Sequence, residues 1–139
     1  MAWTMPATVL ADRADDGWEG IWTLIHTAAR AALHLAEALP FVDGLDFVYA
    51  GADLRNAQQD LEWAAPGLAA RCPAIDLGPV RTDEGTDRAQ AVLGRLIDES
   101  LSRVEALAET DMTVAEALAL ADVACALGCV RTRLEERRS

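Results

Sequence analysis

The sequence predicts an all-α fold, an antiparallel four-helix bundle with a long connection between its second and third helices. Three observations lead to this prediction. Apolar residues recur at alternating spacings of three and four in four segments, prolines bound the first two of these segments, and the single long irregular stretch follows the second. We predict one domain over residues 1–139, because this length is typical of one domain.

The first predicted helix covers residues 17–39 and ends before Pro40, since a residue that precedes proline avoids the helical conformation. Its apolar residues form two adjacent stripes and thus a wide face, which suits contact with two neighbouring helices. The second predicted helix begins near Asp43 or Leu45 and ends or bends at Pro66. The link between these helices is short, so we expect them to pack as antiparallel neighbours.

Two segments are predicted to lack helix. Residues 1–15 carry Pro6 and lead into an acidic, turn-prone stretch, and we expect an extended N-terminal arm there. Residues 72–85 contain Cys-Pro, Gly-Pro and Asp-Glu-Gly steps. A connection of this length is typical of a crossover loop or of a functional lid, and the sequence leaves both open.

The third predicted helix covers residues 86–109, and the fourth follows the strongest start signal in the sequence. Thr113 precedes Glu116 by three residues, which is the spacing of a capping box. Met112 is placed to act as a hydrophobic staple. The fourth helix therefore begins directly after Thr113.

This fourth helix is unusually apolar, because from Val114 to Val130 only Glu116 and Asp122 are charged. Such a helix has to be covered on every side, whereas a helix in a lone bundle keeps one face in water. It therefore either lies in the centre of the fold or contributes its outer face to a subunit interface. We predict a homodimer through this helix, because a twofold contact needs only one self-complementary surface.

The net charge of −11 disfavours polyanionic partners, so we expect no nucleic-acid binding. The basic cluster in residues 131–138 also contains glutamates and suits the C-terminal end of a helix. The longest near-apolar run, residues 117–130, is shorter than the ~20 residues that a membrane span requires. The N-terminus lacks the basic segment of a signal peptide, and we predict a cytoplasmic protein with no membrane partner. All 12 basic residues are arginine, which indicates a GC-rich, bacterial genome.

The three cysteines, Cys72, Cys125 and Cys129, cannot all pair with one another. Cys125 and Cys129 are four residues apart on one predicted helix, where disulfide geometry is poor. We therefore expect free, buried thiols in a reducing compartment. Thiolates at this spacing are candidate ligands for copper(I) or zinc, with Cys72 as a third sulfur. The alternative, which we favour, is that they pack as small hydrophobic residues.

Asp122 is the candidate residue for chemistry, because a carboxylate in an apolar helix needs a partner if it is buried. Arginines on the neighbouring helices are candidate partners: Arg30, Arg55, Arg88, Arg95 and Arg103. We favour a structural role, as a buried ion pair or a device that sets the register of an interface. The alternative is a catalytic acid or base.

The stretch Leu120-Ala121-Asp122-Val123 resembles the aspartate end of a motif in the all-α nucleotide pyrophosphohydrolases of the MazG type. The resemblance implies magnesium-dependent hydrolysis of a nucleoside triphosphate, with Asp122 as a metal-binding carboxylate. Ala119 stands where that family places a glutamate. The resemblance therefore covers four residues and does not assign the chain to the family.

Aromatic residues cluster in the first half of the chain. Trp18, Trp22, Tyr49 and Trp63 are candidates to line a pocket for a small, flat apolar or aromatic ligand, and the alternative is that they belong to the core. His26 and His34 are ~12 Å apart along one helix and cannot share a metal. We interpret them as surface histidines, which gain a hydrogen-bonding role if residues 72–85 fold over them.

The leading functional prediction is a non-enzymatic helical interaction or regulatory module that forms a homodimer through the fourth helix. The alternative is a small-molecule-binding or metal-dependent hydrolytic bundle that uses Asp122 and the aromatic pocket. No glycine-rich phosphate loop, serine nucleophile elbow or zinc-protease motif is present in the sequence, so we expect no cofactor. The sequence leaves open whether the protein is an enzyme.

Overall fold

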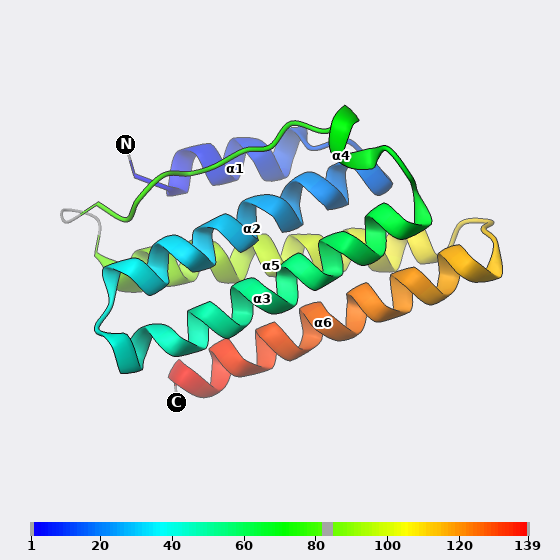
Figure 1. Ribbon diagram of the computed structural model, residues 1–139. Helices are drawn as coiled ribbons and strands as arrows, with labels where there is room; N and C mark the ends of the chain where they lie inside the picture. The colour runs from blue at the N-terminus through cyan, green and yellow to red at the C-terminus, as the bar shows by residue number, and fades with distance from the viewer. Residues whose placement is uncertain (1, 82–84, 139) are drawn as a thin grey trace.

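The computed structural model describes residues 2–81 and 85–138, and all regular secondary structure in this part of the chain is helical. The predicted all-α class is confirmed. The helices are α1 Thr4–Arg13, α2 Trp18–Ala38, α3 Phe41–Ala64, α4 Leu68–Arg71, α5 Thr86–Ala108 and α6 Val114–Arg138 (Figure 1). Six helices thus stand where the sequence predicted four, because α1 forms in the predicted arm and α4 is a separate turn after Pro66-Gly67.

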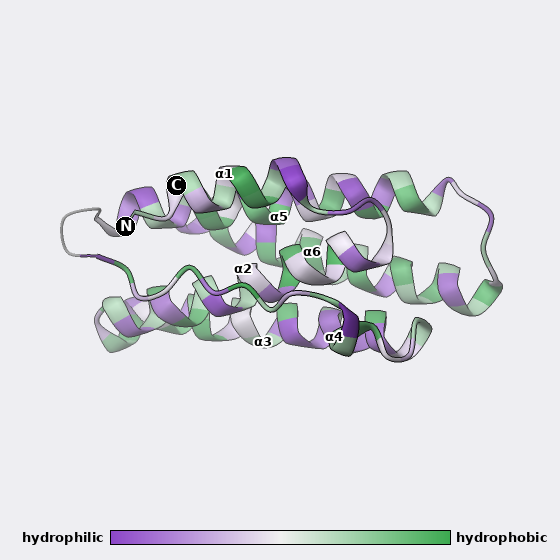
Figure 2. Cartoon of the chain, turned by 90° about the horizontal axis from the view of Figure 1, so that it is seen from above, coloured by the Kyte–Doolittle hydropathy of each residue, from purple (hydrophilic) through white to green (hydrophobic). Residues whose placement is uncertain are grey.

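The four long helices contact one another in a closed ring. Both α2 and α6 contact α3 and α5. Figure 1 shows that α2 and α3 run in opposite directions, as do α5 and α6. The connection from α4 to α5 returns along the length of the molecule, and the view from above shows it passing over α2 (Figure 2). This path positions the chain after Cys72 against the start of α1, where Trp3 Nε1 donates a hydrogen bond of 3.0 Å to the carbonyl of Gly78.

The predicted extended arm is wrong, because residues 4–13 form α1. Trp3, Ala7 and Leu10 recur at spacings of four and three and are all buried. The helix also has a specific partner at its C-terminal end, where the last carbonyl groups find no N–H donor within the helix. Arg103 of α5 donates hydrogen bonds to the carbonyls of Ala11 at 2.7 Å and Ala14 at 2.9 Å. One apolar stripe and one guanidinium therefore hold this segment on α5.

Helix α2 lies at the centre of the core, as its two apolar stripes predict. Its buried residues continue from Gly20 to Leu35, and both α3 and α5 pack against it. Close approach of α3 depends on Gly44, where an added Cβ would lie 2.8 Å from the carbonyl oxygen of Ala36. The glycine lets the backbones of α2 and α3 come together directly after the turn at Pro40.

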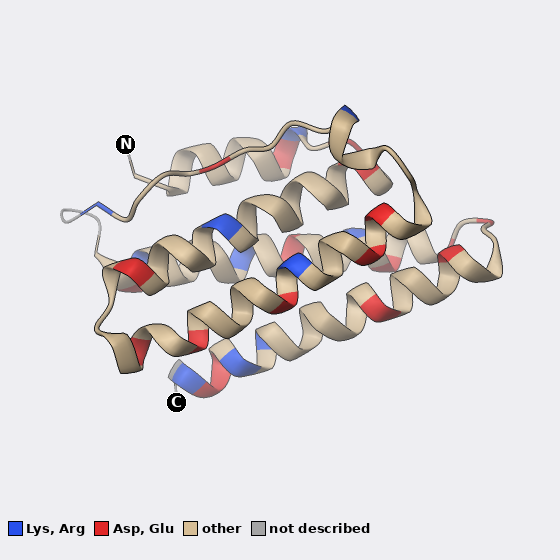
Figure 3. Cartoon of the chain, in the orientation of Figure 1, with Lys and Arg blue, Asp and Glu red and all other residues tan. Residues whose placement is uncertain are grey.

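Helix α6 begins as predicted, with reciprocal hydrogen bonds between Thr113 and Glu116. The Glu116 carboxylate accepts from the Thr113 backbone N–H at 2.9 Å, and the Thr113 hydroxyl accepts from the Glu116 N–H at 3.1 Å. At its other end, Arg133 pairs with Asp53 at 3.1 Å and Arg137 with Asp46 at 3.3 Å, both on α3. Figure 3 shows a basic segment of α6 near the C-terminus and acidic positions on the neighbouring α3.

The expectation that α6 is covered on every side does not hold within one chain. Its buried residues, Leu120, Val123, Leu127 and Val130 among them, face α3 and α5. The opposite side is exposed and carries Val114 and Leu118. Among the described residues, no helix is long and apolar enough to cross a membrane.

Candidate functional site

The four aromatic residues predicted to line a pocket do not come together. Trp22 is 3% exposed, and Trp18 is partly buried against the core. Tyr49 and Trp63 are 55% and 84% exposed on α3, and their sequence separation places them ~20 Å apart along that helix. Of these four residues, Trp22 lies in a cleft with polar groups.

This cleft, which we call the α2–α3 cleft, has a volume of about 310 Å³. Its lining residues are Trp22, His26, Ala29, Arg30, Leu33, Arg55, Gln58, Gln59 and Glu62. The rings of Trp22 and His26 are stacked, with centroids 5.0 Å apart and planes 9° from parallel. The indole N–H of Trp22 donates to Glu62 Oε1 at 3.1 Å. The volume lies at the lower end of the range for small-molecule sites, ~300–1,000 Å³.

The protonation of His26 follows from its partner. Gln58 Nε2 lies 3.1 Å from His26 Nδ1, and an amide nitrogen can only donate, so Nδ1 accepts and Nε2 carries the proton. Burial lowers the pKa of His26, and the positive charges of Arg30 and, to a lesser extent, Arg55 lower it further, while Asp76 and Glu62 oppose the shift. His26 is therefore neutral at neutral pH and has one ring N–H to donate.

The connection between α4 and α5 reaches α2 next to this cleft. Asp76 accepts hydrogen bonds from Arg30 Nε at 3.3 Å, His34 Nε2 at 2.7 Å and the backbone N–H of Gly78 at 2.8 Å. Burial raises the pKa of Asp76, but the hydrogen bonds from Gly78 and His34 outweigh it and hold the pKa below its ordinary value. The hydrogen-bonding role predicted for the histidines under this segment is thus present for His34. Residues 82–84 of the predicted loop or lid lie outside the described part of the chain.

A second cavity, the N-terminal cavity, lies between α1, the start of α2 and residues 71–75. Its volume is about 530 Å³, and most of its wall is apolar, with Met5, Val9 and Ile75 among the lining residues. Arg71 and Glu19, which pair at 3.3 Å, also line it. Sequence reasoning missed this cavity because it treated the arm as extended. The spacing of Trp3, Ala7 and Leu10 was the available signal.

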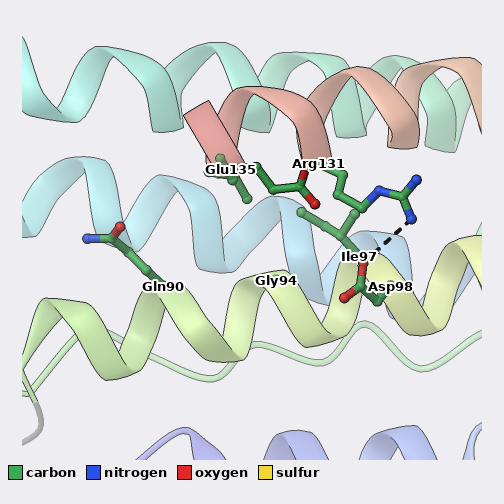
Figure 4. Close-up of a pocket in the computed structure, with 7 residues that line it drawn as sticks. Gln90, Gly94, Ile97, Asp98, Arg131 and Glu135 are labelled. Atoms are coloured by element: carbon green, nitrogen blue, oxygen red, sulfur yellow. Dashed lines mark ion pairs between the residues drawn. The ribbon is translucent and has the colours of Figure 1, made fainter. Parts of the chain in front are cut away.

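A third hollow, between α5 and α6, is too small to be a ligand site. Figure 4 shows Gln90, Gly94 and Asp98 of α5 facing Arg131 and Glu135 of α6. Its volume is about 80 Å³, several times below that of typical ligand pockets. Arg131 and Asp98 approach to 3.9 Å across it. This hollow marks the seam between two helices.

Asp122 is exposed, which corrects the expectation of a buried carboxylate with an arginine partner. In the part of the chain that the structure describes, Asp122 forms no ion pair, and it needs none because water hydrates an exposed carboxylate. Its close neighbour is another acid: burial raises the pKa of Asp60 on α3, and the charge of Asp122 raises it further. Among the described residues, no group of three or more His, Cys, Asp or Glu side chains is placed to hold a metal. The hydrolytic alternative therefore gains no support from these residues.

The three cysteines are free but do not converge. Cys125 and Cys129 are exposed on α6, which corrects the expectation of buried thiols there. Cys72 is half-buried elsewhere, and its thiol donates to the carbonyl of Glu19 at 3.6 Å. Burial raises the pKa of Cys72, and Glu19 adds to this effect. Cys72 is thus not positioned as a third sulfur ligand.

The exposed side of α6 has a regular pattern of its own. We call its central stripe the outer α6 face: Val114, Leu118, Ala121, Cys125, Gly128 and Thr132, at spacings of four and three. Val114 and Leu118 are 77% and 62% exposed. A Cβ added at Gly128 would meet no atom within 4 Å, so packing within the chain does not explain this glycine.

Comparison of the chain with protein-family models, with curated proteins and with solved structures gave no match. The structure itself thus defines an all-α protein whose described residues include an exposed apolar face on α6 and cavities of ligand size, the α2–α3 cleft and the N-terminal cavity among them.

Proposed function

We propose that the protein is a non-enzymatic helical interaction or regulatory module that works as a homodimer through α6. In this proposal α2, α3, α5 and α6 act as an antiparallel four-helix bundle with a long connection between α3 and α5. The observation that carries the proposal is the outer α6 face, where Val114 and Leu118 are exposed. Contiguous exposed apolar surface of this kind is typical of protein interaction sites.

The size pattern of the outer α6 face supports a second copy as the occupant. Spacings of four and three repeat along it, as in helices that pair along a common seam. Its largest residue, Leu118, lies toward one end, and smaller residues from Ala121 to Gly128 follow. If two α6 helices pair in antiparallel orientation about the midpoint of Ala121 and Cys125, Leu118 lies opposite the partner's Gly128 and Val114 opposite the partner's Thr132. The largest residue of the face, Leu118, then meets the glycine, and the central pair, Ala121 and the partner's Cys125, is small.

Gly128 adds an independent argument. A glycine in the interior of a helix costs roughly 0.5–1 kcal/mol relative to alanine. The space outside its Cα is open, so the chain's own packing does not require it. A neighbouring helix that approaches closely at this position supplies a reason for the missing side chain, and a copy of α6 presents Leu118 there.

The test is the oligomeric state of matched variants, measured by sedimentation velocity over a range of protein concentrations. We expect a concentration-dependent dimer, which Leu118→Glu weakens about tenfold or more because it places a charge in an apolar contact. Met5→Glu is the control, since Met5 is exposed to a similar extent but lies on α1. A monomer at all concentrations, or equal effects of the two substitutions, would overturn the homodimer.

A second candidate function is the binding of a small apolar molecule in the N-terminal cavity. Its support is the cavity volume of about 530 Å³ together with its largely apolar wall. Val9→Arg introduces a charge into this wall at a half-exposed position and so leaves the core intact. A thermal-shift series with short-chain alcohols should show stabilisation that this variant loses, and absence of stabilisation in the unsubstituted protein would remove the candidate.

A further inference from the structure

The α2–α3 cleft is rich in hydrogen-bond donors that have no partner among the residues that the structure describes. Arg55 forms no hydrogen bond or ion pair with any other described residue, although it lines the cleft. His26 accepts a hydrogen bond from Gln58 at Nδ1, so its proton is on Nε2. This Nε2–H is likewise unpaired within the described chain. Arg30 uses its Nε for Asp76, which leaves its terminal nitrogens available.

The carboxylates near the cleft are already engaged. Asp76 accepts from Arg30, His34 and the Gly78 N–H. Glu62 accepts from the indole of Trp22. Among the described residues, Arg55 is therefore a cation without a counter-charge, in a protein whose net charge is −11. The charges of Arg30 and Arg55 both lower the pKa of His26, which agrees with a positive local environment in this cleft.

We propose that the α2–α3 cleft binds a small organic molecule through a carboxylate or phosphate group. Arg55 and the terminal nitrogens of Arg30 pair with the oxyanion, since guanidinium groups match the geometry of both anions. The N–H of His26 adds a neutral hydrogen bond. Ala29, Leu33 and the stacked Trp22–His26 rings form the less polar part of the wall, against which the body of the ligand packs. This proposal is independent of the homodimer, because it uses no residue of α6.

The test uses inorganic phosphate, phenyl phosphate and benzoate, with benzyl alcohol as the uncharged comparison, on the full chain. Binding is followed by NMR through the indole N–H of Trp22 and the ring signals of His26. We expect saturable shifts with phenyl phosphate or benzoate, weakened by salt, and little response to benzyl alcohol. Tighter binding of phenyl phosphate indicates a phosphate site, and tighter binding of benzoate indicates a carboxylate site. The difference in affinity between phenyl phosphate and inorganic phosphate shows how much the ligand body contributes.

Arg55→Gln should weaken binding about tenfold or more, because a charge-assisted hydrogen bond to the anion is lost. The substitution removes an exposed side chain with no partner in the described chain, so the fold is preserved. Arg88→Gln on α5 is the matched control and should leave affinity unchanged, since Arg88 is exposed outside the cleft. Equal binding of benzyl alcohol, no saturable shift with any anion, or full affinity in Arg55→Gln would each overturn the proposal.

Discussion

The carboxylate of Asp76 lies 2.7 Å from Nε2 of His34, a residue 42 positions earlier in the chain. Together with the bond from Arg30, this contact attaches the connection between α4 and α5 to the C-terminal half of α2. It also borders the α2–α3 cleft and orients one of that cleft's two arginines. A single surface carboxylate thereby links the path of the longest connection to the geometry of a candidate binding site.

The Asp76 contact should make stability depend on pH in the acid range. Its pKa in the folded protein is below the ordinary value of 3.8, so its stabilising effect is complete above that value and is lost as the pH falls below it. Asp76→Ala should destabilise by about 1 kcal/mol at most, because the carboxylate is partly exposed. Urea denaturation should show this difference at pH 7 and a smaller one near pH 3. A difference that persists unchanged in acid would contradict the assignment.

Arg103 should be essential for the attachment of α1. Its guanidinium donates to three carbonyls at the end of this helix and pairs with Glu99, while only 16% of its side chain is exposed. Arg103→Gln should destabilise by about 2–3 kcal/mol and increase amide exchange in α1. Arg103→Lys should not restore stability, because an ammonium cannot span several acceptors as a guanidinium does. Arg95→Gln, an exposed position on the same helix, is the control for urea denaturation.

Two glycines should respond to alanine in opposite ways. At Gly128 the added methyl enters open space, so the monomer should become more stable by roughly 0.5–1 kcal/mol while the dimer weakens. At Gly44 the methyl meets the Ala36 carbonyl oxygen at 2.8 Å, and the monomer should be destabilised. Thermal unfolding in dilute solution measures the stability of the monomer in both variants. Sedimentation measures the dimerisation of Gly128→Ala. A Gly128→Ala variant that dimerises as well as the unsubstituted chain would argue against close approach at this position.

Charge should oppose dimerisation. Each chain carries a net charge of −11, and Asp122 lies beside the outer α6 face. Added salt should therefore strengthen the dimer by screening repulsion, and Asp122→Asn should do the same at low salt. Sedimentation at several ionic strengths gives both comparisons. If salt or Asp122→Asn weakened association instead, the contact between the two copies would depend on attractive ion pairs and not on the apolar face.

His26 should titrate below its ordinary pKa of 6.5, and its pKa should rise in Arg55→Gln. It should nevertheless stay below 6.5, because burial is the largest cause of the shift. Since the folded-state pKa is lowered, protonation of His26 disfavours the folded state, and stability falls as the pH drops through and below 6.5. NMR titration of the imidazole ring measures the midpoint in both variants. An unchanged midpoint in Arg55→Gln would mean that this guanidinium does not act on the cleft.

The amino-acid sequence by itself determined the four long helices and several of their ends. The recurrence of apolar residues and the Thr113–Glu116 capping box depend on neighbours within a few positions, so these features could be predicted. The same local reasoning missed α1, whose helix is completed by Arg103 from a distant part of the chain. It also assigned Asp122 and the thiols of Cys125 and Cys129 to the interior, because an apolar helix does not reveal which of its sides its neighbours cover.

Only the tertiary structure decided which groups meet in space. The α2–α3 cleft joins His26 to Gln58, and the contact that borders it joins His34 to Asp76, across more than thirty residues of sequence in each case. The N-terminal cavity likewise exists because α1 and residues 71–75 pack against the same end of α2. Local sequence patterns report backbone preference and the presence of an apolar face. The positions of distant side chains depend on helix packing and on the path of the connection, which no local pattern specifies.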